Sequence, residues 1–194
     1  MSHWYGIALF FPALIASIAL RAPHAHRCAK VKVVQSRKGG LEIALLVLMF
    51  PAVLLLPILF ATTSLLSVAD YPLSPWAFSA GALFVALWLW LFHRSHVDLG
   101  TNWSVSLELR EEHTLITSGV YARVRHPMYT SLFCHAIAQA LLLANWIAGP
   151  AMLVAFTAMF LGRLGPEERM MRERFGERYS SYAARTKRLV PGVW

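Results

Sequence analysis

Five apolar runs alternate with polar segments along this chain. They cover residues 4–20, 41–60, 76–92, 130–148 and 151–164. An α-helix rises 1.5 Å per residue, so about 20 apolar residues cross the hydrocarbon core of a bilayer. The last run is too short to cross the core unless its polar end lies slightly within the membrane. The pattern therefore predicts an all-α fold, a polytopic membrane bundle of about five transmembrane helices.

Proline residues mark several expected helix boundaries. Ser74 before Pro75 is typical of a helix start, with a capping hydroxyl followed by proline at the first helical position. Pro51 and Pro57 are expected to kink the second span, a distortion that neighbouring helices of a bundle tolerate. Pro166 is expected to end the fifth span.

The charged tail at residues 166–185 retains apolar side chains at helical spacing. These are Met171, Phe175, Tyr179 and Tyr182. Spacings of three and four residues predict an amphipathic helix that lies on the bundle or at the membrane interface.

The composition is that of an integral membrane protein. Hydrophobic residues make up 57% of the 194-residue chain and charged residues 14%, whereas soluble domains have roughly 45–50% and about 25%. A chain of this length has room for one domain. We therefore expect a single membrane domain over residues 1–194, with three N-terminal spans in 1–94 and a second half in 95–194 that holds the helical hairpin and the tail helix.

The net charge of +8 is concentrated in ways that predict orientation. Residues 21–38 contain six Lys or Arg and no acid, whereas residues 61–75 carry only Asp70. Basic loops stay on the cytoplasmic side, where they also contact anionic lipids. Five spans then place the N-terminus outside and the C-terminus inside. A nucleic-acid partner is not expected, because no recognition motif accompanies the charge. No obligate protein partner is predicted either.

The cysteines and histidines give no signal for a metal site. Cys28 and Cys134 are too few for a disulfide framework and are expected to be free thiols. The histidine pairs at 24/26 and 93/96 do not have the spacing of zinc ligands. We expect no bound metal.

Polar, titratable residues flank the last two apolar runs. His126-Pro127 precedes one run, and Arg163 with Glu167 and Glu168 follows the other. A helical hairpin would bring these two groups together at one membrane face. Proline suits the first helical position, and the free amides of a helix start together with its dipole bind anions. The alternative is an ordinary helix start that His126 caps.

Arg163 and Glu167 also have structural interpretations. Arginine at a span end is commonly a snorkelling anchor. Carboxylates at 167 and 168 would suit the first turn of a tail helix, where they favour its dipole. Because Pro166 separates them, Arg163 and Glu167 need not form a simple i,i+4 pair.

Several of these residues lie in motifs that resemble a known family. The motifs are His113-Thr114-Leu115-Ile116, Ser118-Gly119-Val120-Tyr121, Arg125-His126-Pro127-Met128-Tyr129, Glu167-Glu168, Phe175-Gly176-x-x-Tyr179-x-x-Tyr182 and Arg188-Leu189-Val190-Pro191. Together, over roughly residues 100–191, they resemble the isoprenylcysteine carboxyl methyltransferases. No family signature is identified in the N-terminal spans.

The resemblance implies a membrane enzyme that uses S-adenosylmethionine from the cytosolic side and releases S-adenosylhomocysteine. It implies an acceptor-binding role for Arg163, which would orient a carboxylate. The cofactor contacts that it implies are His113, Thr114, Leu115, Ile116, Tyr121, His126, Pro127, Met128, Tyr129 and Glu167.

The chemistry of these side chains suits methyl transfer. Glu167 offers a charge for the ammonium or a hydrogen bond for the ribose, and Tyr121 and Tyr129 offer rings for the adenine or the sulfonium. A carboxylate acceptor is already ionised at neutral pH, so no general base is required. We expect a lipophilic, prenylated substrate that enters from the bilayer.

Two alternatives remain open at this stage. A relative of the phospholipid N-methyltransferases would keep the cofactor and methylate a lipid amine, without needing Arg163 to hold a carboxylate. A non-enzymatic scaffold would use its basic loops to bind membrane lipids. A reductase that uses a nicotinamide cofactor fits the quoted residues less well.

Overall fold

The computed structural model describes residues 1–28, 33–36, 39–102, 108–110 and 114–193. The helical class is confirmed. Its α-helices are α1 (Trp4–Cys28), α2 (Gly40–Phe50), α3 (Leu56–Thr62), α4 (Pro75–Leu99), α5 (Pro127–Leu142), α6 (Ala151–Phe175) and α7 (Glu177–Arg185). Single-turn helices are the π-helical η1 (Pro51–Leu55) and the 3₁₀ turns η2 (Ser67–Ala69), η3 (Gly100–Asn102) and η4 (Gly119–Ala122). A short antiparallel pair, β1 (Val33–Ser36) and β2 (Glu108–Arg110), is added to the bundle.

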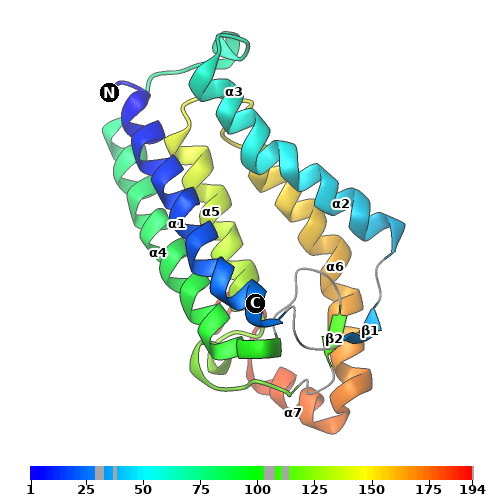
Figure 1. The fold of residues 1–194 in the computed structure, drawn as a ribbon. Helices are drawn as coiled ribbons and strands as arrows, with labels where there is room; N and C mark the ends of the chain where they lie inside the picture. Colours follow the sequence, from blue (N-terminus) through cyan, green and yellow to red (C-terminus); the bar gives the residue numbers. More distant parts are fainter. Residues whose placement is uncertain (29–32, 37–38, 103–107, 111–113, 194) are drawn as a thin grey trace.

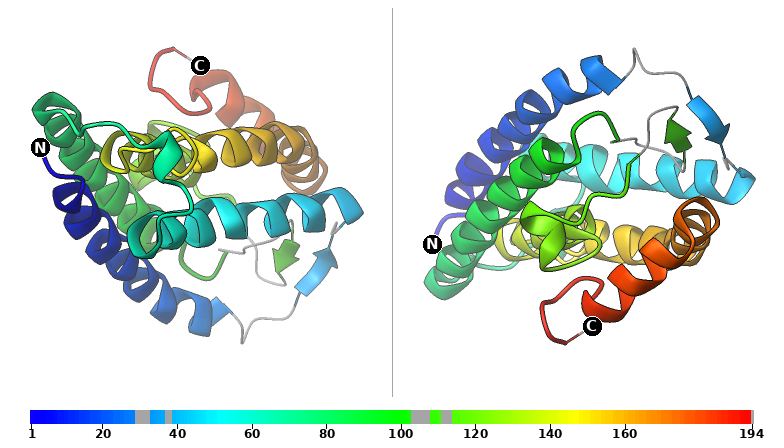
Figure 2. Two further views of the ribbon diagram at one scale, coloured as in Figure 1. Left: turned by 90° about the horizontal axis from the view of Figure 1, so that it is seen from above. Right: turned by 90° about the horizontal axis from the view of Figure 1, so that it is seen from below.

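The helices form two groups that α5 joins (Figure 1). α1, α4 and α5 pack together, and α2 and α3 run beside α6; α5 also contacts α6. Seen from above and below, the two groups are inclined to each other (Figure 2). The N-terminus lies at one end of the bundle, and α7 with the strand pair lies at the other.

Among the described residues, three helices are long and apolar enough to cross a membrane. They cover Trp4–Cys28, Glu42–Thr62 and Pro75–Leu99. Two of them extend beyond the expected boundaries: α1 continues past residue 20, and α4 continues past residue 92 to Leu99. The first half of the basic segment is therefore helical rather than loop. Cys28 ends α1, and both cysteines are buried free thiols, as expected.

The distortion expected at the prolines of the second span is a π-helical turn. Leu56 donates its amide to the carbonyl of Pro51, which leaves the carbonyl of Ala52 outside the regular helical pattern. The side-chain amide of Gln139 on α5 donates to that Ala52 oxygen at 2.9 Å. In a bilayer each freed backbone group needs an internal partner, and here the neighbouring helix supplies one.

The expected ends of the last two helices need correction. α5 stops at Leu142, six residues early, because Asn145 folds back. Its side-chain amide donates to Leu66 O at 2.8 Å and to Asp70 Oδ1 at 2.7 Å. These contacts make a buried turn out of residues expected to be helical.

α6 shows the opposite deviation, because it does not end at Pro166. It runs through this proline to Phe175 and stops at Gly176, whose φ of 54° is a conformation that glycine adopts without strain. Proline removes one helical hydrogen bond, but the continued helix buries Glu168 and Met170. The expected tail helix is thus divided: its first half belongs to α6, and α7 keeps Tyr179 and Tyr182 buried.

Gly6 sets the approach of α1 to α5. A Cβ at this position would stand 2.0 Å from the carbonyl oxygen of Leu142. Small residues at such contacts let membrane helices pack closely. We expect Gly6→Ala to lower the free energy of unfolding by about 2 kcal/mol, because overpacking a close contact typically costs about 1–3 kcal/mol.

Thermal unfolding in detergent measures this effect. Gly165→Ala on α6 is the matched control, since a Cβ there meets nothing within 4 Å, and alanine favours helix over glycine. Equal melting temperatures for the Gly6 variant and the parent protein would contradict the close-packing explanation.

Candidate functional site

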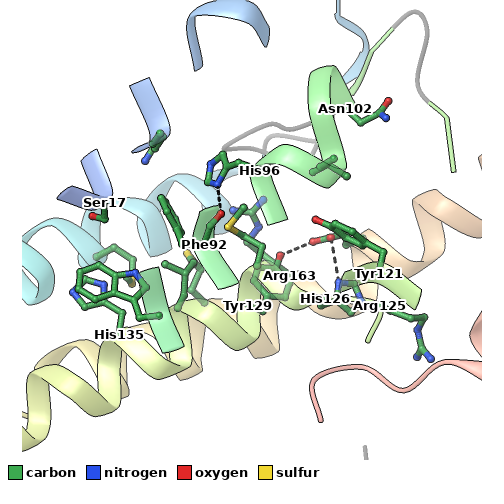
Figure 3. A pocket seen from close by; sticks show the side chains of 18 of the residues that line it. Ser17, Phe92, His96, Asn102, Tyr121, Arg125, His126, Tyr129, His135 and Arg163 are labelled. Atoms are coloured by element: carbon green, nitrogen blue, oxygen red, sulfur yellow. Dashed lines mark hydrogen bonds and ion pairs between the residues drawn. The ribbon is translucent and has the colours of Figure 1, made fainter. Parts of the chain in front are cut away.

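A cavity of about 550 Å³ lies between the two groups of helices. This volume is within the range of about 300–1,000 Å³ that small-molecule sites occupy. Its polar end lies near the start of α5, and its apolar end extends among α1, α2, α4 and α5 (Figure 3). Ser17 and His135 lie at one end of the view, and Tyr121 and His126 lie at the other. One pocket thus joins a titratable end to a hydrocarbon-like end.

The centre of the polar end is a His–Glu–Tyr group, in which His126 and Tyr129 are buried and Glu167 is partly exposed. The Nδ1 atom of His126 lies 3.4 Å from Glu167 Oε1, and the Tyr129 hydroxyl donates to Glu167 Oε2. The rings of His126 and Tyr129 stack at 5.4 Å between centroids. His126 stands at the N-cap position of α5 but makes no side-chain capping bond, and its imidazole lies beside Glu167 and Glu168 instead. The amide of Thr130 donates to the carbonyl of His126 at 3.1 Å, so it is not among the free amides of this helix start.

Glu168 links this group to the C-terminal segment. Its carboxylate accepts from Arg125 at 2.8 Å and from Arg188 at 3.2 Å, and it lies 3.5 Å from His126 Nε2. Two backbone hydrogen bonds also join the segment before α5 to the segment after α7. The amide of Arg125 donates to Lys187 O at 2.7 Å, and the amide of His126 donates to Arg188 O at 3.0 Å. The residues after α7 therefore hold the wall that carries His126 in place.

The charged side chains of this cluster shift one another's pKa values. Burial alone would lower the pKa of His126, but hydrogen bonds and charge attraction from Glu167 and Glu168 outweigh it and raise that pKa. Burial alone would raise the pKa values of the two carboxyl groups. Hydrogen bonds from His126 to both, from Tyr129 to Glu167, and from Arg188 and Arg125 to Glu168, lower them instead. The cluster is therefore most stable as imidazolium with two carboxylates.

A pH dependence of stability follows from these directions. A raised histidine pKa stabilises the fold below the ordinary value of 6.5, and this contribution is lost as the pH rises through the folded-state value. The lowered carboxyl pKa values stabilise the fold above 4.5 and are lost as the pH falls through their folded-state values. We expect the cluster to contribute most between about pH 4.5 and 6.5. Unfolding temperatures in detergent from pH 3 to 9 measure this, and a profile identical in His126→Phe and the parent protein would contradict it.

Tyr121 reaches the cavity because Gly119 and Asp98 shape the turn before it. Gly119 has a φ of 60°, and a Cβ on it would stand 2.1 Å from Asp98 Oδ2. That same oxygen accepts the amide of Val120 at 2.8 Å, and Tyr182 donates to the carbonyl of Tyr121 at 2.6 Å. Burial and the nearby Glu167 raise the pKa of Tyr121. The ring is thus a neutral phenol held on the cavity wall.

Arg163 lies on the cavity wall and pairs with a residue that sequence analysis overlooked. Its guanidinium is 3.7 Å from the carboxylate of Glu42 on α2, and both side chains are buried. Glu42 lies within the run 41–60, which was treated as wholly apolar. A lone carboxylate in an apolar run signals a buried partner or a site, and that signal was available.

Most of the predicted site residues surround the same cavity. Those that line it are Thr114, Leu115, Ile116, Tyr121, His126, Met128, Tyr129, Arg163 and Glu167. Pro127 is buried at the start of α5 and does not line the cavity. His113 lies outside the described residues. Their roles stay predictions, whereas their proximity is a property of the fold.

Sequence reasoning also missed residues that complete the polar end. Asn102 lines the cavity, and its side chain holds Thr114 by two hydrogen bonds, at 3.0 Å to the amide and 3.2 Å to the hydroxyl. Arg125 was seen only as part of a motif, yet it bridges Glu168 and the carbonyl of Ala183. Among the described residues, no group of three or more His, Cys, Asp or Glu is arranged to hold a metal.

Comparison with known proteins finds a family that part of the chain resembles. The sequence profile of the isoprenylcysteine carboxyl methyltransferase (ICMT) family matches residues 82–173. Over 120 residues, 61% of this chain, it is 34% identical to the rat protein-S-isoprenylcysteine O-methyltransferase and 33% identical to the human one, covering 42% of each. It is 29% identical to protein-S-isoprenylcysteine O-methyltransferase B of Arabidopsis thaliana, covering 61% of that protein.

The chain thus matches less than two thirds of the length of these relatives. The matched region contains α5, most of α4 and nearly all of α6, which carry His126, Tyr129, Arg163 and Glu167 around one cavity. Over residues 82–173, the chain is therefore similar to the isoprenylcysteine carboxyl methyltransferase family.

Proposed function

We propose that this protein transfers a methyl group from S-adenosylmethionine to the carboxylate of a prenylated cysteine or a similar lipophilic thioether acid. The observation that carries the proposal is the single cavity with Glu167, His126 and Tyr129 at its polar end, Arg163 on its wall and an apolar extension. A charged methyl donor suits the polar end of this cavity, and a lipophilic methyl acceptor suits its apolar end.

The polar end fits the donor in charge and shape. A carboxylate at Glu167 complements a sulfonium or an ammonium, and the aromatic rings of Tyr121 and Tyr129 suit a cation or an adenine. Thr114, Leu115 and Ile116 offer an extended wall beside them. When bound, S-adenosylmethionine would supply an electrophilic methyl group on its sulfonium and would leave as S-adenosylhomocysteine.

Arg163 is the residue that would hold the acceptor. Its guanidinium lines the cavity and is buried, and arginine binds carboxylates by paired hydrogen bonds. Glu42 is absent from the cavity lining, so it would position Arg163 from behind rather than touch the acceptor. An ionised carboxylate attacks without a base, so rate enhancement would come from positioning and from removing water around the opposite charges.

The membrane arrangement completes the proposal. The apolar end of the cavity would receive the prenyl chain from the bilayer. We propose five spans, with α5 and α6 added to the three identified by length and composition, the N-terminus outside, and the polar end of the cavity and C-terminus on the cytoplasmic side. α7 would then lie at the cytoplasmic interface as an amphipathic helix, and the partners would be membrane lipids and the acceptor.

Calorimetry and turnover test the function separately. Detergent-purified protein is titrated with S-adenosylmethionine, and methyl transfer to N-acetyl-S-farnesyl-cysteine is then followed. We expect micromolar binding and a methyl ester product. Absence of binding well above micromolar concentration would overturn the proposal. Methylation of phosphatidylethanolamine in place of the thioether acid would favour the amine alternative.

A further inference from the structure

A buried imidazole occupies the apolar end of the cavity, far from the proposed chemistry. His135 lines the cavity and is only 3% exposed. It lies on α5 six residues beyond Tyr129, which is roughly 9 Å further along a helix axis. Its Nε2 has no hydrogen-bond partner among the residues that the structure describes. Leu14, Val53, Leu132 and Met152 also line the cavity.

The proposed methyl transfer makes no use of this histidine. An ionisable side chain within a membrane bundle commonly faces a cavity and marks the path of a ligand. A plain prenyl chain is a hydrocarbon, so it would leave the imidazole unpaired, and an unpaired buried polar group destabilises the complex. The deep end of this cavity is therefore more polar than a hydrocarbon tail requires.

The surroundings hold the ring in one orientation. The indole of Trp88 stacks on the imidazole at 3.7 Å between centroids with an interplanar angle of 2°. Phe10 packs at 5.7 Å, tilted by 31°. One face is thus covered by Trp88, and the ring nitrogens lie on the edge. A partner for them must approach in the ring plane, which is the geometry of a hydrogen bond and not of stacking.

A second polar group belongs to the same end. Ser17 on α1 lines the cavity and is buried, and its hydroxyl donates to Leu14 O at 2.7 Å. The hydroxyl oxygen still has lone pairs to accept a hydrogen bond. Ser17 and His135 are drawn at the same end of the pocket (Figure 3). An imidazole and a hydroxyl acceptor together suit an oxygen-bearing group.

We propose that the lipophilic acceptor carries a hydroxyl in the distal part of its tail, that this hydroxyl accepts a hydrogen bond from His135 and donates one to the Ser17 oxygen, and that Trp88 positions the imidazole. The inference rests on the proposed function and narrows its substrate class. The acceptor is then an oxygenated lipid acid rather than an unsubstituted prenyl thioether.

Matched acceptors test the proposal. The probes are N-acetyl-S-farnesyl-cysteine and two analogues that carry either a hydroxyl or an aldehyde oxygen on the terminal isoprene unit. In the parent protein we expect the preferred oxygenated analogue to bind about tenfold more tightly, as one well-made hydrogen bond supports. The aldehyde can accept from His135 but cannot donate to Ser17, so it is expected to bind less tightly than the hydroxyl compound. Equal or weaker binding of both analogues would overturn the proposal.

Variants of His135 and Ser17 test whether these residues cause the preference for the oxygenated acceptor. His135→Phe keeps a ring to stack on Trp88 and removes the nitrogens, so it is expected to abolish the preference while still binding the farnesyl compound. Ser17→Ala is expected to reduce it. Leu132→Met, a volume-conserving change on the same wall, is the control and keeps the ratio between acceptors. An unchanged ratio in both His135→Phe and Ser17→Ala would refute the assignment.

A readout without turnover separates this inference from the proposed function. The shift of the unfolding temperature on adding each lipid reports binding in the absence of S-adenosylmethionine. If farnesyl and oxygenated compounds are methylated equally, the inference fails and the proposed function stands. If S-adenosylmethionine does not bind but the oxygenated lipids still stabilise the parent protein and not His135→Phe, the proposed function fails and the subsite remains.

Discussion

Glu167→Gln is expected to weaken binding of S-adenosylmethionine by about a hundredfold or more. The Glu167 carboxylate accepts from Tyr129 and pairs with His126 on the cavity wall. Glutamine removes the negative charge that would face a cationic donor and leaves the imidazolium with one carboxylate fewer. Breaking a buried charge pair costs about 3–5 kcal/mol, and each 1.4 kcal/mol is about tenfold in affinity.

Isothermal titration calorimetry in detergent measures this change. Glu173→Gln is the matched control, because that side chain lies on the same helix but is exposed, and it is expected to bind like the parent protein. Unfolding temperatures of both variants show whether lost binding reflects lost structure. Binding by Glu167→Gln within threefold of the parent value would assign this carboxylate a purely structural role.

Arg163→Lys is expected to lower kcat/KM for a carboxylate acceptor by roughly a hundredfold while S-adenosylmethionine binds as before. Lysine keeps the positive charge beside Glu42 but lacks the planar guanidinium that binds a carboxylate through two parallel hydrogen bonds. Poorer orientation at the reacting atoms costs rate as well as affinity. The loss is therefore expected in both KM and kcat, measured with N-acetyl-S-farnesyl-cysteine.

A double variant controls for the buried pair. Arg163 and Glu42 lie 3.7 Å apart, so removing one alone leaves the other charge buried. Arg163→Met combined with Glu42→Gln removes both charges and should fold better than Arg163→Met alone. Full turnover by either arginine variant would favour an amine acceptor, which does not need a carboxylate clamp.

The residues placed best by sequence reasoning are those with strong local signals. Proline at the start of α5 marked the helix boundary, and the motif around Tyr121 had a glycine where the turn needs a positive φ. The expected hairpin was enough to bring Arg163 and Glu167 near His126. These features depend on backbone preferences over a few residues, which a sequence carries directly.

The predicted ends of α5 and α6 were wrong because tertiary contacts outweigh the local preference of the sequence there. Pro166 would end a solvated helix, yet α6 continues because the following turns bury Glu168 against Arg125 and Arg188. α5 ends early because Asn145 reaches Asp70, a residue 75 positions away. Neither effect has a signature within the segment that it changes.

Apolar runs and motif spacing are enough to predict a helical membrane protein with titratable residues at the ends of its last two long helices, because both signals are local. Three other features become visible only in the folded bundle: Glu42 pairs with Arg163, Glu168 contacts both His126 and several arginines, and His135 stacks on Trp88 at the far end of the cavity. Those pairings join different helices, and their distances depend on how the whole bundle packs.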